Sequence, residues 1–454
     1  MTNSTEHPYD VIVLGGGPGG EHCAAHLAQA GLRVAIVERD RLGGECDYYA
    51  CIPSKTLLRP GEALQAAREV PGAREAITGR LDTEQALAWR DFMVRNYSDD
   101  GPERWAKSEG IDVIRGAGML AGPGKVAVDG RVYSAPDIVI STGSDPVIPP
   151  IDGLRGLDGV WTNREATGLK LVPRRLIVLG GGPVGVEMAQ AIARMGASVA
   201  LVEGMDHLLP REPKPLGDAL GSALAAEGIE LCFGQHASAV RRDGDEFVVE
   251  FPERQPLRGD RLLVATGRRP RVQGLGLESV GIEPGKRGIE VDSGMAAGDG
   301  LWAIGDVTGI WPLTYVSKYQ GRIAAANILG TRREANYDAV PRVVFTDPQA
   351  ASVGQGDGPV TATVQLAEVA RTATYTRAYD EKPGFMTLGS DGEVITGAYA
   401  LGPEAGEWLQ QATVAIRARV PLELMNDVIQ PFPTFSEVFL HALEELGARV
   451  PAPV

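Results

Sequence analysis

YDVIVLGGGPGGEHCAAHLAQAGLRVAIVERD, residues 9–40, is the stretch that decides the fold. An apolar run at 11–14 leads into a glycine-rich turn, an alanine-rich stretch follows, and a second apolar run ends at Glu38. This order predicts strand, tight turn, helix and strand, the unit that binds dinucleotides. The turn lets backbone approach a pyrophosphate at the helix N-terminus, and we expect Glu38 to accept hydrogen bonds from an adenosine ribose. The motif glycines are Gly15, Gly17 and Gly20.

The same unit occurs again in RRLIVLGGGPVGVEMAQAIARMGASVALVEG, residues 174–204. The strand predicted at 176–179 precedes the second glycine turn, and Glu203 closes the next predicted strand. A carboxylate at this place suits a free ribose 2′-hydroxyl and repels a 2′-phosphate, and residues 204–210 contain no arginine. The sequence therefore predicts that this second site prefers NADH over NADPH. Its motif glycines are Gly180, Gly182 and Gly185.

Length and charge limit the class of protein. The chain has 454 residues, a hydrophobic fraction of 44% and a formal net charge of −15, which fits two or three domains and disfavours nucleic acid or an acidic membrane as a partner. The start MTNSTEHPYD shows no signal pattern, and no run approaches the roughly 18 apolar residues of a membrane span. We therefore expect a cytoplasmic protein.

Linkers rich in proline and glycine flank the second unit. SDPVIPPIDGL precedes it and TGRRPRVQGLGLE follows it, and both are interpreted as domain crossings. From about Val340 the pattern changes to alternating apolar positions followed by a helical stretch. This change predicts a third domain, of the α+β kind.

Two of the four cysteines, Cys46 and Cys51, lie close together in GGECDYYACIPSK, residues 43–55. In a chain expected to be cytoplasmic, such a pair favours redox or metal chemistry over a structural disulfide. Zinc is the weaker interpretation, because the other cysteines and the six histidines form no second ligand pair. Two buried apolar cysteines are the remaining alternative.

The geometry of an α-helix limits how Cys46 and Cys51 can form a disulfide. On an ideal helix, Cα atoms five residues apart are about 8.6 Å apart, beyond the roughly 7 Å that a disulfide tolerates. If the cysteines bridge, Cys46 must lie off the regular helix, in an irregular first turn, while Cys51 lies at the helix N-terminus, where the pKa of a thiol is lowered. Two dinucleotide sites and this pair indicate an electron path from nicotinamide through flavin to a disulfide.

From Tyr9 to about Leu446 the chain resembles the class I pyridine nucleotide-disulfide oxidoreductases, the group of dihydrolipoamide dehydrogenase, glutathione reductase and mercuric reductase. The resemblance rests on both glycine motifs and on motifs that occur in family order: GGECDYYACIPSK, VISTGSDP, LLVATGRRP, LWAIGDVTG, KYQGRIAAANI and VFTDPQAASVG.

The resemblance implies an α/β fold with two Rossmann-like domains and a C-terminal α+β dimerisation domain. FAD would occupy residues 1–148 and 271–335, NAD(P)H residues 149–270, and residues 336–454 would form a homodimer in which each active site borrows residues from the partner's end. The further cofactor-binding residues that it implies are Thr142, Gly143, Gly267, Gly305 and Asp306, the last near the ribityl and pyrophosphate region.

The resemblance also implies roles at the reaction centre. Cys51 would be the thiolate that faces the flavin, and Cys46 the interchange thiol that attacks the external substrate. Lys55 and Glu187 match an ion pair near flavin N5.

The chain departs from the family near its C-terminus. Disulfide reductases of the family carry a histidine base in an HPTxSE pattern, whereas QPFPTFSE places Phe432 at that position and keeps Glu437. Because general acid–base help is worth about 10²- to 10⁴-fold, ordinary exchange with lipoamide or glutathione is expected to be slow. His441 is a weak substitute, since one turn beyond Glu437 it is expected to pack or face solvent.

Two further departures concern access to the acceptor. The intercysteine segment is DYYA, so Tyr48 and Tyr49 either alter access to the disulfide or pack inside the fold. The end ELGARVPAPV lacks the cysteine pair that mercuric reductases use, so efficient mercury reduction is not expected.

The leading interpretation is an FAD-dependent, NADH-preferring oxidoreductase that reduces a disulfide, dithiol or other small acceptor through Cys46 and Cys51. The alternatives are direct transfer from flavin to a quinone, dye or oxygen, a divergent dihydrolipoamide dehydrogenase, and a non-catalytic flavoprotein subunit. No motif in the sequence names the acceptor.

Overall fold

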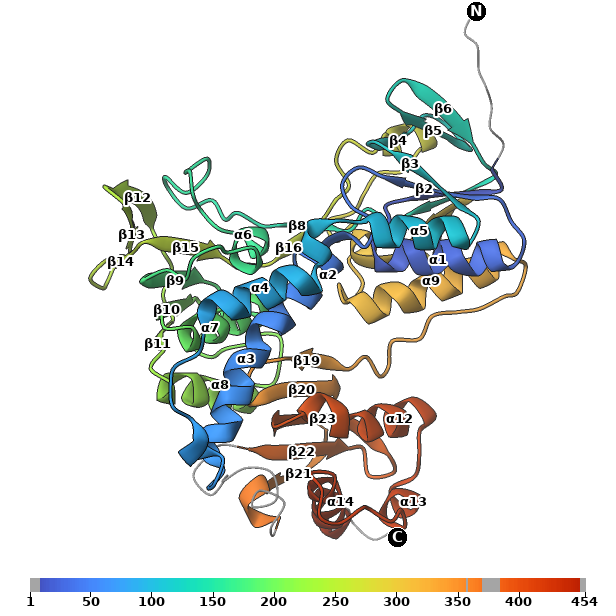
Figure 1. Cartoon of the computed structure of the whole chain (residues 1–454). Coiled ribbons are helices and arrows are strands. Elements are labelled where there is room, and N and C mark those ends of the chain that lie inside the picture. Colours follow the sequence, from blue (N-terminus) through green and yellow to red (C-terminus); the bar gives the residue numbers. More distant parts are fainter. Residues whose placement is uncertain (1–8, 357, 370–383, 450–454) are drawn as a thin grey trace, which may run out of the picture. The chain divides into compact units, whose positions relative to one another are not determined.

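A computed structural model describes residues 9–356, 358–369 and 384–449 in two compact units (Figure 1). The first unit contains the chain up to Pro53, Arg90–Val147 and Gly267–Asn336. The second contains Ser54–Trp89, Ile148–Thr266 and the chain from Tyr337 on. None of the helices in these described ranges combines the length and hydropathy that a membrane crossing needs.

The first unit is built on a six-stranded sheet of order β17-β18-β7-β1-β2-β3, in which β1 pairs in parallel with β2 and β7. Strand residues alternate between two cores, as expected of a sheet covered on both faces. On one face, the long helices α1 and α9 lie side by side (Figure 1). On the other, the small sheet β4-β5-β6 packs. The bounds are β1 Val11–Leu14, α1 Pro18–Gln29, β2 Val34–Glu38, β3 Ile111–Arg115, β4 Gly118–Leu120, β5 Lys125–Val128, β6 Arg131–Ser134, β7 Asp137–Ile140, β17 Ala296–Gly298, β18 Leu301–Ala303 and α9 Thr314–Ile328.

Helices α2 to α5 lie along the chain around the cysteine pair, and a short two-stranded ribbon joins the two linkers. The helical region that follows β2 is divided, with a five-residue helix before a long one. The two linkers pair with one another as the antiparallel ribbon β8-β16. The bounds are α2 Gly44–Tyr48, α3 Cys51–Glu69, α4 Thr83–Met93, α5 Asp100–Ser108, β8 Ser144–Pro146 and β16 Arg268–Pro270.

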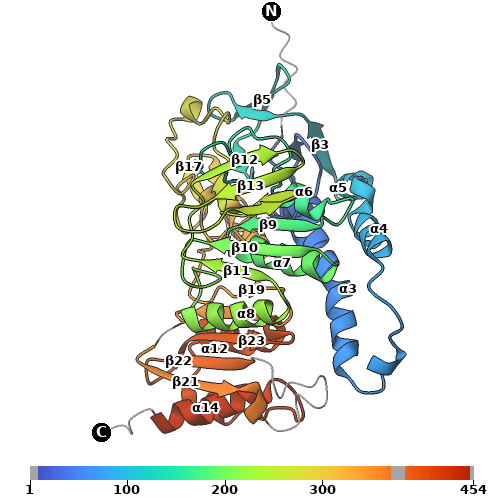
Figure 2. The same cartoon turned by 90° about the vertical axis from the view of Figure 1, so that its left-hand side faces the viewer.

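The second unit begins with a parallel sheet of order β11-β10-β9-β15 (Figure 2). One face of this sheet packs against α7 and α8, and the other against the antiparallel sheet β12-β13-β14. This is the second Rossmann-like unit that the sequence predicts. The bounds are α6 Asn163–Thr167, β9 Arg175–Leu179, α7 Pro183–Arg194, β10 Ser198–Glu203, α8 Lys214–Ala226, β11 Glu230–Phe233, β12 Ala239–Asp243, β13 Glu246–Glu250, β14 Leu257–Gly259 and β15 Arg261–Val264.

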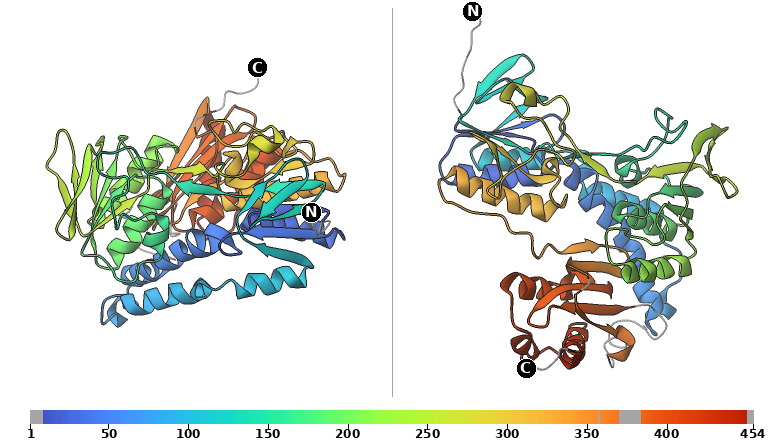
Figure 3. Two further views of the ribbon diagram at one scale, coloured as in Figure 1. Left: turned by 90° about the horizontal axis from the view of Figure 1, so that it is seen from above. Right: turned by 180° about the vertical axis from the view of Figure 1, so that it is seen from behind.

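The C-terminal part of the second unit is an antiparallel sheet of order β19-β20-β23-β22-β21 (Figure 3, orange to red). Helices α12 and α14 cover one face. The opposite face contributes Phe385, Tyr399 and Leu401 to the core that also contains α3, α7 and α8. The bounds are β19 Arg342–Val344, β20 Gln349–Gly354, β21 Val360–Gln365, β22 Phe385–Ser390, β23 Ile395–Gly402, α11 Ala405–Trp408, α12 Gln410–Ala418, α13 Leu422–Asn426 and α14 Glu437–Arg449.

Candidate functional site

Both glycine turns have the shape that a dinucleotide requires. Gly15 adopts φ +106°, and a Cβ on Gly20 would lie 2.0 Å from the carbonyl oxygen of Gly15. A Cβ on Gly17 would meet no atom within 4 Å, so the helix N-terminus is open beside it. The second turn repeats this geometry: Gly180 adopts φ +109°, a Cβ on Gly185 would lie 1.9 Å from its oxygen, and Gly182 is open. The residues of both turns therefore fit a bound pyrophosphate.

The two acids also occupy equivalent places. Glu38 accepts hydrogen bonds from the N–H of Gly16 (2.8 Å) and of Asp40 (2.7 Å). Glu203 accepts them from the N–H of Gly181 (2.7 Å) and of Met205 (2.9 Å). Each carboxylate is buried, and each of its oxygens accepts one hydrogen bond from a backbone N–H. The remaining lone pairs can accept hydrogen bonds from ribose hydroxyls.

The loops after β7 and β18 bring four of the predicted cofactor residues into one region of the first unit. Ser144 donates a hydrogen bond of 2.6 Å to Asp306, and Thr142 donates one of 2.9 Å to the carbonyl of Arg271. Gly143 (φ +76°) and Gly305 (φ +75°) are left-handed at the same strand ends, the edge where α/β sheets bind ligands. The fifth residue, Gly267 (φ +120°), lies just before β16 and accepts a hydrogen bond from the N–H of Val147.

The cysteines lie on two helices. Cys46 lies in α2, and Cys51 is the first residue of α3. Cys46 thus lies off the regular helix α3, as expected of a pair that can bridge, but on a short helix of its own and not in an irregular first turn. Tyr49 (φ −134°, ψ −1°) leaves the helical conformation and separates α2 from α3.

Cys46 and Cys51 are both in the thiol form, and their environments differ. The hydrogen bond to Cys51 and then burial raise the pKa of Cys46 far above its usual range. The sulfur of Cys51 lies 3.2 Å from Oγ1 of Thr314, a residue that no sequence pattern identified. Cys51 is the first residue of α3, where a helix N-terminus stabilises a thiolate.

Lys55 and Glu187 form the ion pair that the sequence resemblance implies. The Lys55 ammonium lies 2.7 Å and 3.0 Å from the two oxygens of Glu187, whose side chain is only 6% exposed. Phe345, which sequence reasoning missed although it lies in VFTDP, completes the arrangement. Its N–H donates to Glu187 (3.0 Å), and its ring centroid lies 4.7 Å from the ammonium.

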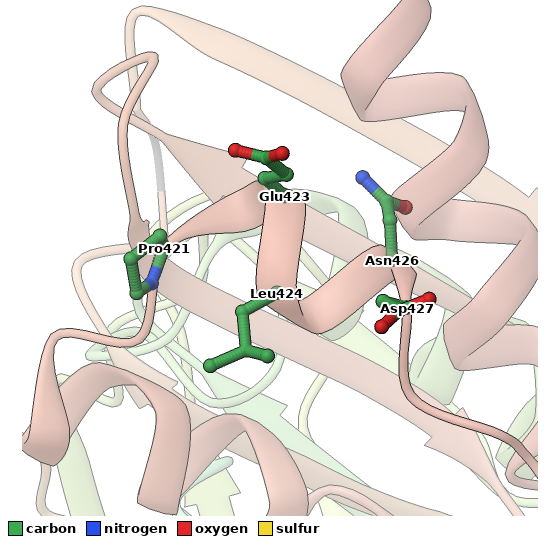
Figure 4. A pocket seen from close by; sticks show the side chains of 5 residues that line it. All are labelled: Pro421, Glu423, Leu424, Asn426 and Asp427. Atoms are coloured by element: carbon green, nitrogen blue, oxygen red, sulfur yellow. The ribbon is translucent and has the colours of Figure 1, made fainter.

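The C-terminal motif presents an aromatic ring to solvent. Phe432 is 66% exposed, and Glu437 is the first residue of α14. The side chain of His441 is partly exposed and lies 3.7 Å from Glu444, so of the two placements expected for it, packing or solvent, the structure favours solvent. A pocket in this domain is lined by Pro421, Glu423, Leu424, Asn426 and Asp427 (Figure 4), and it contains none of the predicted site residues.

Tyr48 packs inside the first unit, and Tyr49 is half-buried. Tyr48 is 0% exposed and donates to the carbonyl of Ser98 (3.3 Å), while the hydroxyl of Tyr49 contacts the guanidinium of Arg41. Cys23 is a fully buried core residue.

Comparison with known proteins assigns the family. Residues 9–321 match the model described as "Pyridine nucleotide-disulphide oxidoreductase", and residues 340–443 match its dimerisation domain. A dihydrolipoyl dehydrogenase of Thermus scotoductus is 33% identical over 96% of this chain and 97% of that protein. A mercuric reductase of Acidithiobacillus ferrooxidans is 34% identical over 94% and 80%.

Solved structures agree. The HOCl-induced flavoprotein disulfide reductase RclA from Escherichia coli matches with a TM-score of 0.83 and 28% identity, over 98% of this chain and 100% of that one. LpdA from Mycobacterium tuberculosis matches with a TM-score of 0.85 and 27% identity, over 96% and 99%. The chain therefore belongs to the class I pyridine nucleotide-disulfide oxidoreductases, the flavoenzymes that bind FAD and use NAD(P)H.

Proposed function

We propose that this enzyme carries electrons from NADH to the Cys46/Cys51 pair and from there to a small disulfide or related acceptor. The observation that carries the proposal is the placement of the two thiols, with Cys51 at the start of α3, its sulfur 3.2 Å from Oγ1 of Thr314, and Cys46 on the separate helix α2. When bound, FAD supplies the conversion of a hydride from NADH into two electrons for the disulfide. The acceptor's identity is not set by this pair alone.

The binding residues divide between the two glycine turns. We assign Gly15, Gly17, Gly20, Glu38 and the 142–143 and 305–306 loops to FAD. Gly180, Gly182, Gly185, Glu203 and Gly267 are assigned to NADH. The corresponding domains are residues 1–148 with 271–335, residues 149–270, and residues 336–454, the last as the homodimer contact.

The cysteines divide the exchange chemistry between them. Cys46, once deprotonated, attacks one sulfur of the acceptor disulfide and displaces the other as a thiolate, which gives a mixed disulfide. Cys51 then attacks Cys46, which closes the internal disulfide and releases the second thiolate. The two thiols of the enzyme are oxidised, and one acceptor disulfide is reduced to two thiols. Lys55, held by Glu187, is assigned to the flavin edge.

A second function is favoured by one observation, the exposed ring of Phe432 where the family pattern has a histidine base. Phenylalanine moves no proton, so exchange with lipoamide or glutathione lacks acid–base help worth about 10²- to 10⁴-fold. An apolar acceptor such as a quinone, reduced directly from flavin, needs no such base.

An anaerobic reductive titration separates the two functions. The enzyme is expected to take up four electrons per FAD and to develop a long-wavelength thiolate-to-flavin band, whereas Cys46→Ser takes up two. Cys232→Ser, which changes a cysteine outside the pair, is the control and is expected to take up four. Uptake of only two electrons by the parent enzyme, without the band, means that the pair is idle and that the acceptor takes electrons from flavin.

A further inference from the structure

A strained turn follows α4. Arg95, Asn96 and Tyr97 have φ values of 54°, 50° and 61°, so three successive residues other than glycine adopt the left-handed conformation. L-residues avoid it because their Cβ approaches the next carbonyl oxygen. Such a conformation persists only where surrounding contacts fix it, so the contacts of this turn are informative.

Those contacts reach the segment that carries Cys46. Arg95 Nη1 lies 3.0 Å from Oδ2 of Asp47, the residue after Cys46. The carbonyl of Tyr97 accepts a hydrogen bond of 2.7 Å from Nε of Arg41. The ring centroids of Tyr97 and Tyr49 lie 6.1 Å apart.

The two residues after the turn extend the same contact. The carbonyl of Ser98 accepts from the buried Tyr48 hydroxyl (3.3 Å), and Oδ2 of Asp99 accepts from the N–H of Leu42 (3.0 Å). At the centre, the guanidinium of Arg41 lies 5.9 to 6.0 Å from the ring centroids of three tyrosines, within the range of cation–π attraction. These tyrosines are Tyr48, Tyr49 and Tyr97.

The other side of α2 is fixed by the first glycine turn. The N–H of Gly43 donates to the carbonyl of Gly16 (2.8 Å), and a Cβ on Gly44 would lie 2.9 Å from Cα of Gly17. Helix α2 is therefore held between the glycine turn and the 95–97 turn. Because Cys46 lies in α2, these contacts also fix the position of Cys46.

We propose that the 95–97 turn is a clamp that positions Cys46 against Cys51, with Arg95 and Tyr97 as positioning residues. The inference rests on the proposed redox role of the pair. Oxidation joins the two sulfurs in a bond near 2.05 Å, and the two electrons and two protons pass to the acceptor disulfide, which becomes two thiols. Holding α2 in place raises the effective concentration of one thiol at the other, which stabilises the disulfide.

The test measures the equilibrium of the Cys46/Cys51 pair with reduced and oxidised glutathione, in the FAD-containing enzyme and by mass spectrometry of trapped thiols. Arg95→Ala and Asp47→Asn both break the ion pair, so both are expected to lower the equilibrium constant for disulfide formation, by about threefold. Arg95→Lys is expected to restore most of it. Arg33→Ala, which breaks a similar exposed pair with Asp10 in the same unit, is the control.

A charge effect alone gives a different pattern. Asp47→Asn would then favour the thiolate and the reduced pair, whereas Arg95→Ala would favour the disulfide. Opposite shifts, or no shift in either variant, overturn the clamp. A titration in which the parent takes up two electrons overturns the proposed function instead, since the glutathione equilibrium is measured without turnover.

Discussion

The Lys55 ammonium is held by both oxygens of the buried Glu187 carboxylate, at 2.7 Å and 3.0 Å. Lys55→Met keeps the length of the side chain and removes its charge at the proposed flavin edge. Because preorganised charges there are worth at least tenfold in rate, we expect NADH to reduce the flavin about tenfold or more slowly, measured by stopped-flow absorbance.

The matched control for that variant is Lys214→Met. Lys214 pairs with Asp206 and Asp218 on an exposed surface of the second unit. In the Lys214→Met enzyme, NADH is expected to reduce the flavin at the parent rate. Equal rates in the parent enzyme and Lys55→Met would remove Lys55 from the reaction.

Glu203 is expected to set the preference for NADH. Glu203→Gln removes the charge that repels a 2′-phosphate, so the ratio of 5′-AMP to 2′,5′-ADP affinity should fall about tenfold. Calorimetric titration of the two fragments measures this ratio without turnover. Glu230→Gln, an exposed change in the same sheet, should leave it unchanged. A ratio unaffected by Glu203→Gln would show that other groups distinguish the 2′-hydroxyl from a 2′-phosphate.

Glu21 should make the stability of the fold depend on pH. Burial, followed by the charge of Asp47, raises the pKa of Glu21 from 4.5 to about 8, and its Oε1 has no hydrogen-bond partner. The folded state therefore keeps a proton that the unfolded state loses above pH 4.5. The resulting stability is complete below that pH and is lost as pH rises toward 8, by an amount on the order of 4 kcal/mol.

Glu21→Gln removes this titration. The variant is expected to match the parent in melting temperature near pH 4.5 and to exceed it near pH 8, in thermal unfolding followed by circular dichroism. Glu84→Gln, an exposed change in α4, serves as the control. An equal rise in melting temperature at both pH values would mean that changed packing, and not the titration of Glu21, causes the effect.

A buried network joins two parts of the second unit. Arg194 pairs with Asp347 at 3.0 Å and with Glu227 at 2.6 Å, and its side chain is 11% exposed. Arg194→Met leaves two acids without their cation, and we expect a loss of about 3 kcal/mol in urea unfolding. Arg241→Met, at an exposed pair, should lose less than about 1 kcal/mol. Similar losses in both variants would contradict a special role for the buried network.

Phe432→His tests the missing base. If that base is the only defect, lipoamide reduction should rise by about 10²-fold or more, while flavin reduction by NADH stays unchanged. Val414→His, which adds a histidine at an exposed position of α12 in the same domain, controls for a nonspecific effect. A variant without gain would mean that the acceptor site differs in shape as well.

The sequence predicts the Rossmann-like units because each depends on local pattern. Apolar runs, turn glycines and the terminal acids Glu38 and Glu203 are spaced by backbone geometry that sequence displays directly. The backbone hydrogen bonds of those acids were not predicted, since N–H groups carry no sequence signal. The C-terminal sheet was also predicted, from alternation and from resemblance.

The neighbourhood of Cys46 shows where sequence reasoning ends. Helix α2 has five residues, too few to show helical periodicity, and its end at Tyr49 depends on contacts with Arg41 and Tyr97. Those partners come from separate segments, so no local pattern brings them together. The left-handed residues 95–97 carry no glycine that would reveal their conformation.

The C-terminal sheet buries both of its faces, and this has a consequence for synthesis on the ribosome. The α8 helix ends at Ala226, but β23, which packs beside it, is complete only at Gly402. At roughly 5–20 residues per second, the nascent chain exposes an apolar surface for on the order of ten seconds or more. We therefore expect a chaperone that binds apolar segments to bind this protein during translation. A chain that ends before β19 would keep this surface exposed and would stay bound.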